Sequence, residues 1–269
     1  MTTSRDRPSL PSPARRRMRA RHLQNVFAFA CLALLASAWV ATATAQVRTA
    51  TDAQGRALKV DGSIVIVQPD IELSLLTAGG LSEPRKEWSE AARTLYPQAV
   101  HALLDARHVA TRADFRVPDG LDSASHLGQI LLLNQAVALS IAQYSQPSSA
   151  LATKKDPATG KPRLDWSLGP GVSELRAATG ADYALFTYIR DSYASEGRKT
   201  LRVLGIIAGA AMGGFADIGG GRQIGVATLV DLRSGKVVWF NLMQRQSGDL
   251  RSADGAQATV AQMLKDLPL

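Results

Sequence analysis

The chain has 269 residues, a formal net charge of +8 and one cysteine. The positive charge gathers at the start, because seven of the 31 basic residues are arginines within the first 22 positions, beside a single acid. From residue 46 onward, 24 basic residues nearly balance 22 acidic ones. The charge of that part therefore gives no reason to expect a nucleic-acid partner. With a single cysteine, a framework of intrachain disulfides is excluded.

An uncharged, largely apolar stretch, residues 23–45, follows the basic start and ends in Ala43-Thr44-Ala45. This order is typical of a secretory signal peptide, which we expect to be cleaved before Gln46. An uncleaved anchor is the alternative, because a membrane span needs about 20 residues. Cys31 lacks the sequence setting of a lipid-modified cysteine, so we do not expect a lipoprotein. We therefore expect an exported protein that is periplasmic or associated with the cell envelope.

Residues 46–62 are polar and contain glycine, and we expect them to form a flexible lead-in. Residues 63–269 are then expected to form a single α/β domain. Its first two strands are predicted over 63–69, which is rich in β-branched residues, and over 71–76, which alternates apolar and polar residues.

A long amphipathic helix is predicted to follow, because apolar residues recur at spacings of three, four and seven. The stripe consists of Trp88, Ala91, Ala92, Leu95, Ala99, Ala102, Leu103 and Ala106. Ser82 is expected to cap this helix, and Pro97 to bend it or to split it in two. A second helix is predicted from Ser123 to about Tyr144. The segment 145–171 is rich in Pro, Ser, Gly and Lys and is expected to be a loop that is either mobile or faces a partner.

The last hundred residues carry the clearest pattern. A short helix is predicted over 172–180, closed by its final glycine, and a strand over 181–193. Two more strands, 222–232 and 236–244, flank the tight turn Arg233-Ser234-Gly235. A terminal helix is expected to start at a Ser252 cap. The fold class is therefore α/β, with a mixed, largely antiparallel sheet and helices packed on its faces.

Between two of these strands lies a glycine-rich insert, 191–221, which contains Gly205, Gly209 and Gly213 at four-residue spacing. In a helix this spacing leaves a groove without side chains, where another backbone can approach closely. The apolar run 203–215 would be about 20 Å long as a helix, too short for a bilayer core of about 30 Å. We expect a close-packing helix whose partner is its own domain, a second subunit or a membrane surface.

The C-terminal part resembles the bacterial envelope family that includes CsgG, LpoB and the N-terminal domain of TolB. The residues that carry the resemblance are Gly180, Ala181 and Asp182 before a strand, and Asp231, Ser234, Gly235, Val237 and Trp239 in the hairpin that follows. The resemblance covers about a third of residues 46–269. It implies a mixed sheet with helices on its faces, residence in the envelope, and work by binding proteins or assembling. The chain differs from that family in having no lipid-modification cysteine and in carrying the insert.

The chain offers little that is typical of a catalyst. His101, Asp105 and His108 would share one helical face at spacings of four and three, where they could hold a metal ion, but that face is the polar one opposite the apolar stripe. The glycines of 213–225 lack the lysine and the strand-to-helix setting of a phosphate loop. No G-x-S-x-G elbow occurs. We therefore expect no enzyme, no cofactor and no metal.

The sequence predicts a non-catalytic exported envelope protein that acts by contact with another envelope protein or by self-association. The glycine seam Gly205, Gly209 and Gly213 is the candidate contact, and Asp231, Gly235 and Trp239 mark the hairpin. A membrane-active or secretion-related component that uses the insert is the alternative. A metal-dependent enzyme built on His101, Asp105 and His108 is the second alternative.

Overall fold

The structure is a computed structural model that describes residues 44–52, 54–145, 148–211, 221–246 and 248–269. The chain divides into two units, Met1–Thr42 and Ala43–Leu269. All described residues lie in the second unit, and the account that follows concerns that unit by itself.

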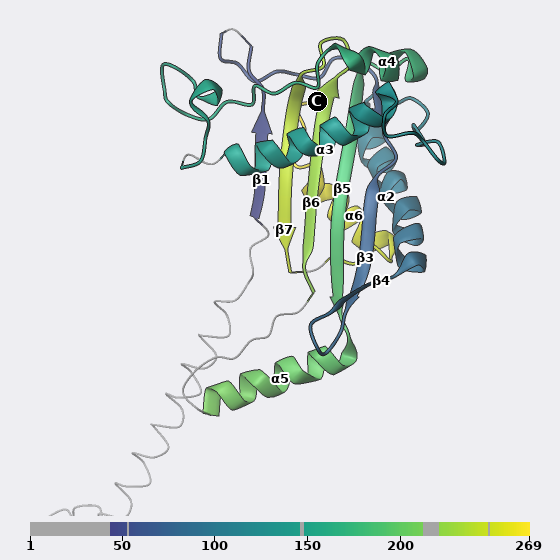
Figure 1. The fold of residues 1–269 in the computed structure, drawn as a ribbon, viewed down its shortest axis with the longest axis vertical. Coiled ribbons are helices and arrows are strands. Elements are labelled where there is room, and N and C mark those ends of the chain that lie inside the picture. Colours follow the sequence, from purple (N-terminus) through teal and green to yellow (C-terminus); the bar gives the residue numbers. More distant parts are fainter. Residues whose placement is uncertain (1–43, 53, 146–147, 212–220, 247) are drawn as a thin grey trace, which may run out of the picture. The chain divides into compact units, whose positions relative to one another are not determined.

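Its centre is a seven-stranded sheet in the order β1-β7-β6-β5-β3-β4, with β2 also paired to β5 (Figure 1). The strands are β1 (Thr44–Thr49), β2 (Ile64–Ile66), β3 (Asp70–Leu76), β4 (Ser82–Pro84), β5 (Tyr183–Ala194), β6 (Gln223–Asp231) and β7 (Val237–Arg245). Only β2 and β3 run parallel to their neighbour β5, while the other pairs are antiparallel. The predicted mixed, largely antiparallel sheet is confirmed.

Helices cover both faces of this sheet, as the fold class predicted (Figure 1). One face packs against α2 (Lys86–Ala106) and α6 (Ala253–Met263), and the other against α3 (His126–Tyr144) and α4 (Ser173–Thr179). The alternation along β5 explains the two cores, since Leu185 and Ile189 enter the first and Ala184 and Phe186 the second. The face under α3 is covered only in its upper part, and no labelled helix lies over its lower part in Figure 1.

The expected flexible lead-in is not what the structure has. Residues 46–49 belong to β1, which pairs with β7 along its whole length. The side chain of Val47 packs against the core, and Ala50 is buried. The polar composition was misleading because alternate residues of an edge strand face different surroundings, and only one side needs apolar residues.

The start of the first long helix also differs from the prediction. Ser82 does not cap it, because Ser82–Pro84 pairs with β3 as β4 and the helix begins at Lys86. Pro97 does not split α2, which continues to Ala106. The turns on both sides of Pro97 are fastened by buried Tyr96 and Val100, which offset the missing backbone hydrogen bond.

Where the structure describes it, the segment after α3 is attached to the domain through its C-terminal part. It includes the short 3-10 helices Ala152–Lys154 and Pro170–Val172. Its Leu164 and Leu168 are buried in the core under α3. Two backbone hydrogen bonds fix it to the β6–β7 turn, from Leu168 N–H to the Gly235 carbonyl (2.8 Å) and from Val237 N–H to the Trp166 carbonyl (2.9 Å).

The elements after residue 172 are found where the pattern predicted them. Gly180 closes α4 with φ of 64°, and Gly235 forms the β6–β7 turn with φ of 72°. Ser252 caps α6, since its side chain accepts from Gly255 N–H. α3 was predicted to begin at Ser123. It begins three residues later, at His126, and Ser125 is its cap.

The glycine-rich insert contains a helix, α5 (Glu196–Ala211), which leaves the end of β5 and extends beyond the sheet (Figure 1). Close to its start, Gly197 lies against Ala78 of the β3–β4 connection. Gly205 and Gly209 lie within this helix, whereas Gly213 lies outside the described residues. Among the helices of the described residues, none has the length and apolar character needed to cross a membrane.

Candidate protein-contact surface

The metal site of the second alternative, built on His101, Asp105 and His108, is not assembled in the described residues. His101 Nε2 lies 2.8 Å from Asp114 Oδ1, a residue that the spacing did not include. His108 follows the end of α2 with φ of 57°, so it does not continue the helical face of His101 and Asp105. In the part of the chain that the structure describes, no three His, Cys, Asp or Glu side chains are grouped closely enough to hold a metal ion.

The residues of the hairpin build the turn itself. The two carboxylate oxygens of Asp231 accept from Arg233 N–H and from the Ser234 hydroxyl, each at 2.8 Å. Trp239 is fully buried in the core under α2 and α6. These contacts explain why Asp231, Ser234 and Trp239 occur in the hairpin: they stabilise the turn and the core, and no binding site is needed to explain them.

Asp182, another residue of the resemblance, fastens that hairpin to the start of β2. Its carboxylate accepts from Ser63 N–H at 3.0 Å and from the Arg233 guanidinium at 2.6 Å. The hydrogen bond from Ser63 N–H, followed by the contact with Arg233, holds the pKa of Asp182 below its usual value.

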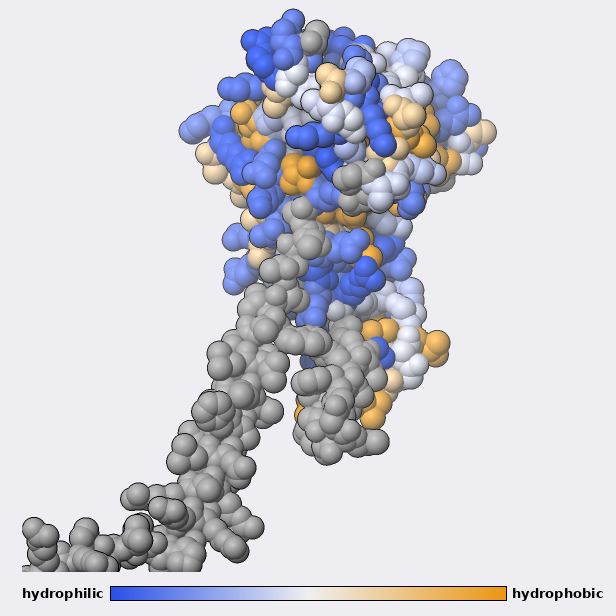
Figure 2. Space-filling model, turned by 90° about the vertical axis from the view of Figure 1, so that its left-hand side faces the viewer, coloured by the Kyte–Doolittle hydropathy of each residue, from blue (hydrophilic) through white to orange (hydrophobic). Residues whose placement is uncertain are grey.

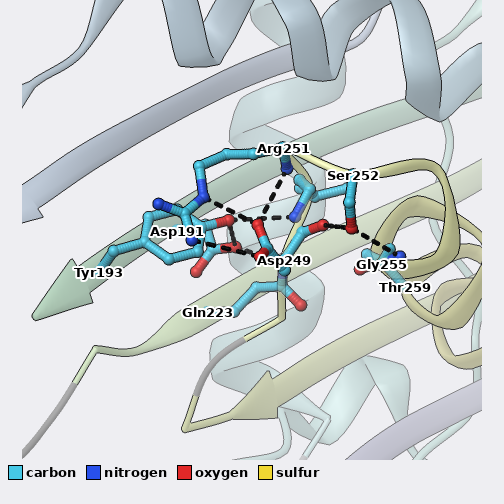
Figure 3. Close-up of polar contacts among 9 residues, drawn as sticks. Asp191, Tyr193, Gln223, Asp249, Arg251, Ser252, Gly255 and Thr259 are labelled. Carbon is cyan, nitrogen blue, oxygen red and sulfur yellow. Dashed lines mark hydrogen bonds and ion pairs between the residues drawn. The ribbon is translucent and has the colours of Figure 1, made fainter.

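A polar cluster that the sequence did not indicate lies near the end of β5, which precedes α5 in the chain (Figure 3). Asp191 Oδ2 accepts from the Tyr193 hydroxyl at 2.6 Å and from Gln223 Nε2 at 2.7 Å. The Arg245 guanidinium donates to Gln223 Oε1 and to the Thr259 hydroxyl, both at 2.5 Å. The cluster therefore joins β5, β6 and β7 to α6.

Burial dominates the electrostatics of this cluster. Asp191 is only 2% exposed, and this burial raises its pKa to about 6 against the favourable contacts of Tyr193 and Gln223. Burial also lowers the pKa of Arg245, although the charge of Asp191 acts in the opposite direction. Because its hydrogen bonds connect three strands and a helix, we interpret the cluster as a structural connection within the fold.

The neighbouring loop adds aromatic contacts to this connection. Arg251 donates to Asp249 (Figure 3). Its guanidinium lies over the rings of Tyr193, at 4.1 Å, and Trp88, at 4.9 Å. Leu250 N–H donates to the Tyr193 hydroxyl at 3.1 Å. These contacts seat the segment before α6 on the end of β5.

The surface of α3 is the most unusual feature of the exterior. Between residues 127 and 144 the helix contains no charged residue. Leu132, Leu133 and Leu139 are 53, 42 and 58% exposed, and Ala136 between them is also exposed. We call these four residues the α3 face. Large apolar side chains grouped on a helix without charges are typical of a protein-contact surface.

A pocket of about 250 Å³ adjoins the α3 face, between α3 and the sheet. Its walls include Leu131, Ala138, Phe186, Tyr188 and Val226. At its inner end the side-chain amide of Asn134 donates to the Thr228 hydroxyl at 2.8 Å, so this buried polar pair is satisfied. The pocket extends the apolar character of the α3 face inward.

The α3 face was not predicted from the sequence, although a signal for it is present. The centre of that helix is apolar all round rather than along one stripe, which in a helix that covers only one sheet leaves some leucines exposed. The second exposed apolar group, Leu201, Val203 and Leu204, lies on α5, within the insert that the sequence did single out.

The described part of the chain thus defines an α/β module in which a mixed sheet lies between two helical layers. No protein-family model and no curated protein matches the chain. Two solved structures of the PelC dodecamer from Paraburkholderia phytofirmans are similar. For a variant PelC, the identity is 13%, the coverage is 84% of this chain and 99% of that chain, and the TM-score is 0.37. The other has 15% identity, 84% and 98% coverage, and a TM-score of 0.34.

Values this low carry no inference about function. Neither of the two structures is of CsgG, LpoB or TolB, so that resemblance stays a prediction from the sequence.

Proposed function

We propose that this protein is a non-catalytic, exported component of the bacterial envelope that acts by assembling with copies of itself through the α3 face. The observation that carries the proposal is the group of exposed leucines on a helix without charge, next to an apolar pocket. The basic start and apolar stretch of the leader support export.

The energetics favour burial of this surface. Fully burying one leucine side chain stabilises by about 1.5–3 kcal/mol, and Leu132, Leu133 and Leu139 each have about half of their surface still to bury. Because no charge on α3 between residues 127 and 144 has to be desolvated, this gain is not offset by a large electrostatic cost.

Light scattering of the purified protein over a range of concentrations tests this proposal. We expect the wild type to form an oligomer, and Leu132→Glu and Leu139→Glu to shift it toward the monomer. The matched control is Ala102→Glu, which places the same charge on an exposed position of α2. A monomeric wild type, or an oligomer that both α3 variants leave intact, would contradict the proposal.

A second candidate function is contact with a membrane surface through α5. It is favoured by the exposed Leu201, Val203 and Leu204 on a helix that extends away from the sheet, and hydrophobic residues are visible on that projecting helix in Figure 2. Flotation with anionic liposomes tests it. We expect binding by the wild type and loss of binding in Val203→Asp/Leu204→Asp, while Leu132→Glu should bind like the wild type. Wild-type protein that stays at the bottom of the gradient would exclude this role.

A further inference from the structure

A second pocket, of about 350 Å³, lies between α2 and the segment that follows this helix. Three parts of the chain line it, namely α2, the end of β2 with the residues just after it, and residues 114–116. We call it the α2 pocket. Its volume is in the range of pockets that hold small ligands. Apart from Gln68, it shares no lining residue with the pocket beside the α3 face.

The segment that carries Arg116 is held in place by hydrogen bonds on both sides of this residue. Phe115 N–H donates to the Ile66 carbonyl at 2.9 Å, and the Phe115 carbonyl accepts from Gln68 N–H at 2.7 Å. Val117 N–H donates to Gln68 Oε1 at 2.9 Å. The last contact orients the Gln68 amide and leaves its NH₂ group as a donor. The walls of the α2 pocket are therefore formed without a ligand, as in most ligand sites.

Two arginines that line the α2 pocket, Arg93 and Arg116, have no carboxylate partner. Within the described residues, neither guanidinium takes part in an ion pair or a hydrogen bond. This differs from an arginine such as Arg190, which is paired with Asp70. A guanidinium keeps its charge at neutral pH, and its paired N–H donors match the geometry of a carboxylate or a phosphate. The two arginines thus offer the pocket two unused anion-binding groups.

Asp114 is the one carboxylate among the residues that line the α2 pocket, and it does not neutralise both arginines. Its Oδ1 lies 2.8 Å from His101 Nε2, so this oxygen is already engaged. Its Oδ2 makes no hydrogen bond within the described residues and is able to accept one from a hydroxyl group. An acceptor beside two cations suits a ligand that carries hydroxyl groups as well as an acidic group.

The other side chains of the α2 pocket include apolar and amide groups. Pro69, Pro97 and Phe115 offer apolar surface, and Gln68 and Gln98 offer amides. A sugar ring has the matching character, because its C–H groups contact apolar surface while its hydroxyl groups exchange hydrogen bonds with amides.

We propose that the α2 pocket binds an anionic sugar, a ligand of monosaccharide size with one carboxylate or phosphate group. Arg93 and Arg116 hold the acidic group through charge-assisted hydrogen bonds. Asp114, Gln68 and Gln98 hold hydroxyl groups of the ring. The inference goes beyond the proposed self-association and does not depend on it, since no residue of the α3 face lines this pocket.

Isothermal titration calorimetry of the purified protein tests the site with defined probes. The ligands are glucuronate, glucose 6-phosphate, glucose and acetate. We expect at least one of the two anionic sugars to bind about tenfold or more tightly than glucose, which lacks the charge, and than acetate, which lacks the ring. Comparison of glucuronate with glucose 6-phosphate then shows which acidic group the arginines prefer. Absence of binding by both anionic sugars would overturn the proposal, and so would binding no tighter than that of acetate.

Substitution of the two arginines tests their role. We expect Arg93→Gln/Arg116→Gln to weaken the binding of the anionic sugar about tenfold or more. The matched control is Arg107→Gln/Arg112→Gln, which removes two exposed arginines that do not line the α2 pocket and also have no ion pair within the described residues. This control should bind like the wild type. Circular dichroism should show both variants folded. Equal binding by the two double variants would refute the role of Arg93 and Arg116.

The outcomes keep this site separate from the α3 face. We expect Leu132→Glu to bind the anionic sugar like the wild type, and Arg93→Gln/Arg116→Gln to have the same oligomeric state as the wild type. A monomeric protein that binds the sugar would contradict the proposed self-association and support the α2 pocket. An oligomer that binds neither anionic sugar would do the reverse.

Discussion

The protonation of Asp191 is coupled to the stability of the fold. Burial raises its pKa from the usual 3.8 to about 6, so the folded state binds a proton more tightly at this site than the unfolded chain does. Its stabilising contribution is therefore complete below pH 3.8 and is lost as the pH rises through about 6.

We expect Asp191→Asn to be more stable than the wild type above pH 7. A rise in the pKa from 3.8 to about 6 corresponds to about 3 kcal/mol, which the neutral amide would recover because it is never ionised. Urea unfolding at pH 4 and at pH 8 measures the effect, and the difference between variant and wild type should be small at pH 4. A variant that is less stable at both pH values would show that the carboxylate is required by its hydrogen bonds.

Asp182→Asn serves as a control of opposite sign. The pKa of Asp182 is lowered by Ser63 N–H and Arg233, so its contribution is present at neutral pH and lost on acidification. We expect Asp182→Asn to be less stable than the wild type at pH 7, and the difference to shrink as the pH falls below 4.

Gly235 and Gly160 allow the destabilisation caused by steric crowding around a Cβ atom to be measured separately from backbone strain. Both have positive φ, 72° and 67°, but a Cβ at Gly235 would lie 2.1 Å from the Gly169 carbonyl oxygen, whereas a Cβ at Gly160 would meet nothing within 4 Å. We expect Gly160→Ala to cost about 1 kcal/mol from backbone strain, and Gly235→Ala about 3 kcal/mol or more because the hairpin must also move. Thermal unfolding of the two variants checks this order. Equal losses would mean that the segment at Gly169 shifts without cost.

The contacts that the structure describes between α5 and the domain lie near the first turn of the helix, where Gly197 lies against Ala78. β5 and β6 remain paired up to Asp191 and Gln223. We expect replacement of residues 196–220 by a four-residue turn to leave the unfolding midpoint within a few degrees of the wild type, because the described contacts of α5 with the domain lie near its first turn. Calorimetry measures this. A loss of more than about 10 °C would mean that the insert supports the core.

The sequence predicted best those elements whose signals are local. The α4 and α6 helices carry their own end signals in Gly180 and Ser252, and the β6–β7 hairpin carries its turn at Gly235. β1 and β4 were not predicted, because both are short polar segments with no strand pattern of their own. β1 is a strand because it pairs with β7, and β4 is a strand because it pairs with β3. No pattern within six residues encodes such a neighbour.

The candidate sites show the same limit. The insert was found because its glycine spacing is visible in the sequence, and the α3 face was missed because exposure depends on how much of the helix the sheet covers. The Asp191 cluster draws on β5, β6, β7 and α6, and only the strand register brings its members together. His101 contacts Asp114. It does not share a helical face with His108, because α2 ends at Ala106, before His108.

For the whole molecule, β1 is expected to be a required part of the sheet. We expect a chain that starts at Thr51 to be less stable by about 3 kcal/mol than one that starts at Gln46. The chain that starts at Gln46 keeps four of the six residue pairs between β1 and β7, whereas the chain that starts at Thr51 keeps none and exposes the edge of β7. Urea unfolding compares the two, and light scattering should show aggregation of the shorter chain. Equal stability of both chains would mean that β7 needs no outer neighbour.

The pairing of β1 with β7 also has a consequence for the order of events during export. The predicted cleavage pattern ends at Ala45, inside β1, and a peptidase requires an extended segment that is free of other strands. In the proposed export, β1 would be among the first segments to cross a membrane, whereas its partner β7 lies close to the other end of the chain and would cross among the last. Until β7 has crossed, Thr44 and Ala45 have no strand to pair with. This delay leaves an interval in which the peptide bond after Ala45 is accessible and the leader can be removed.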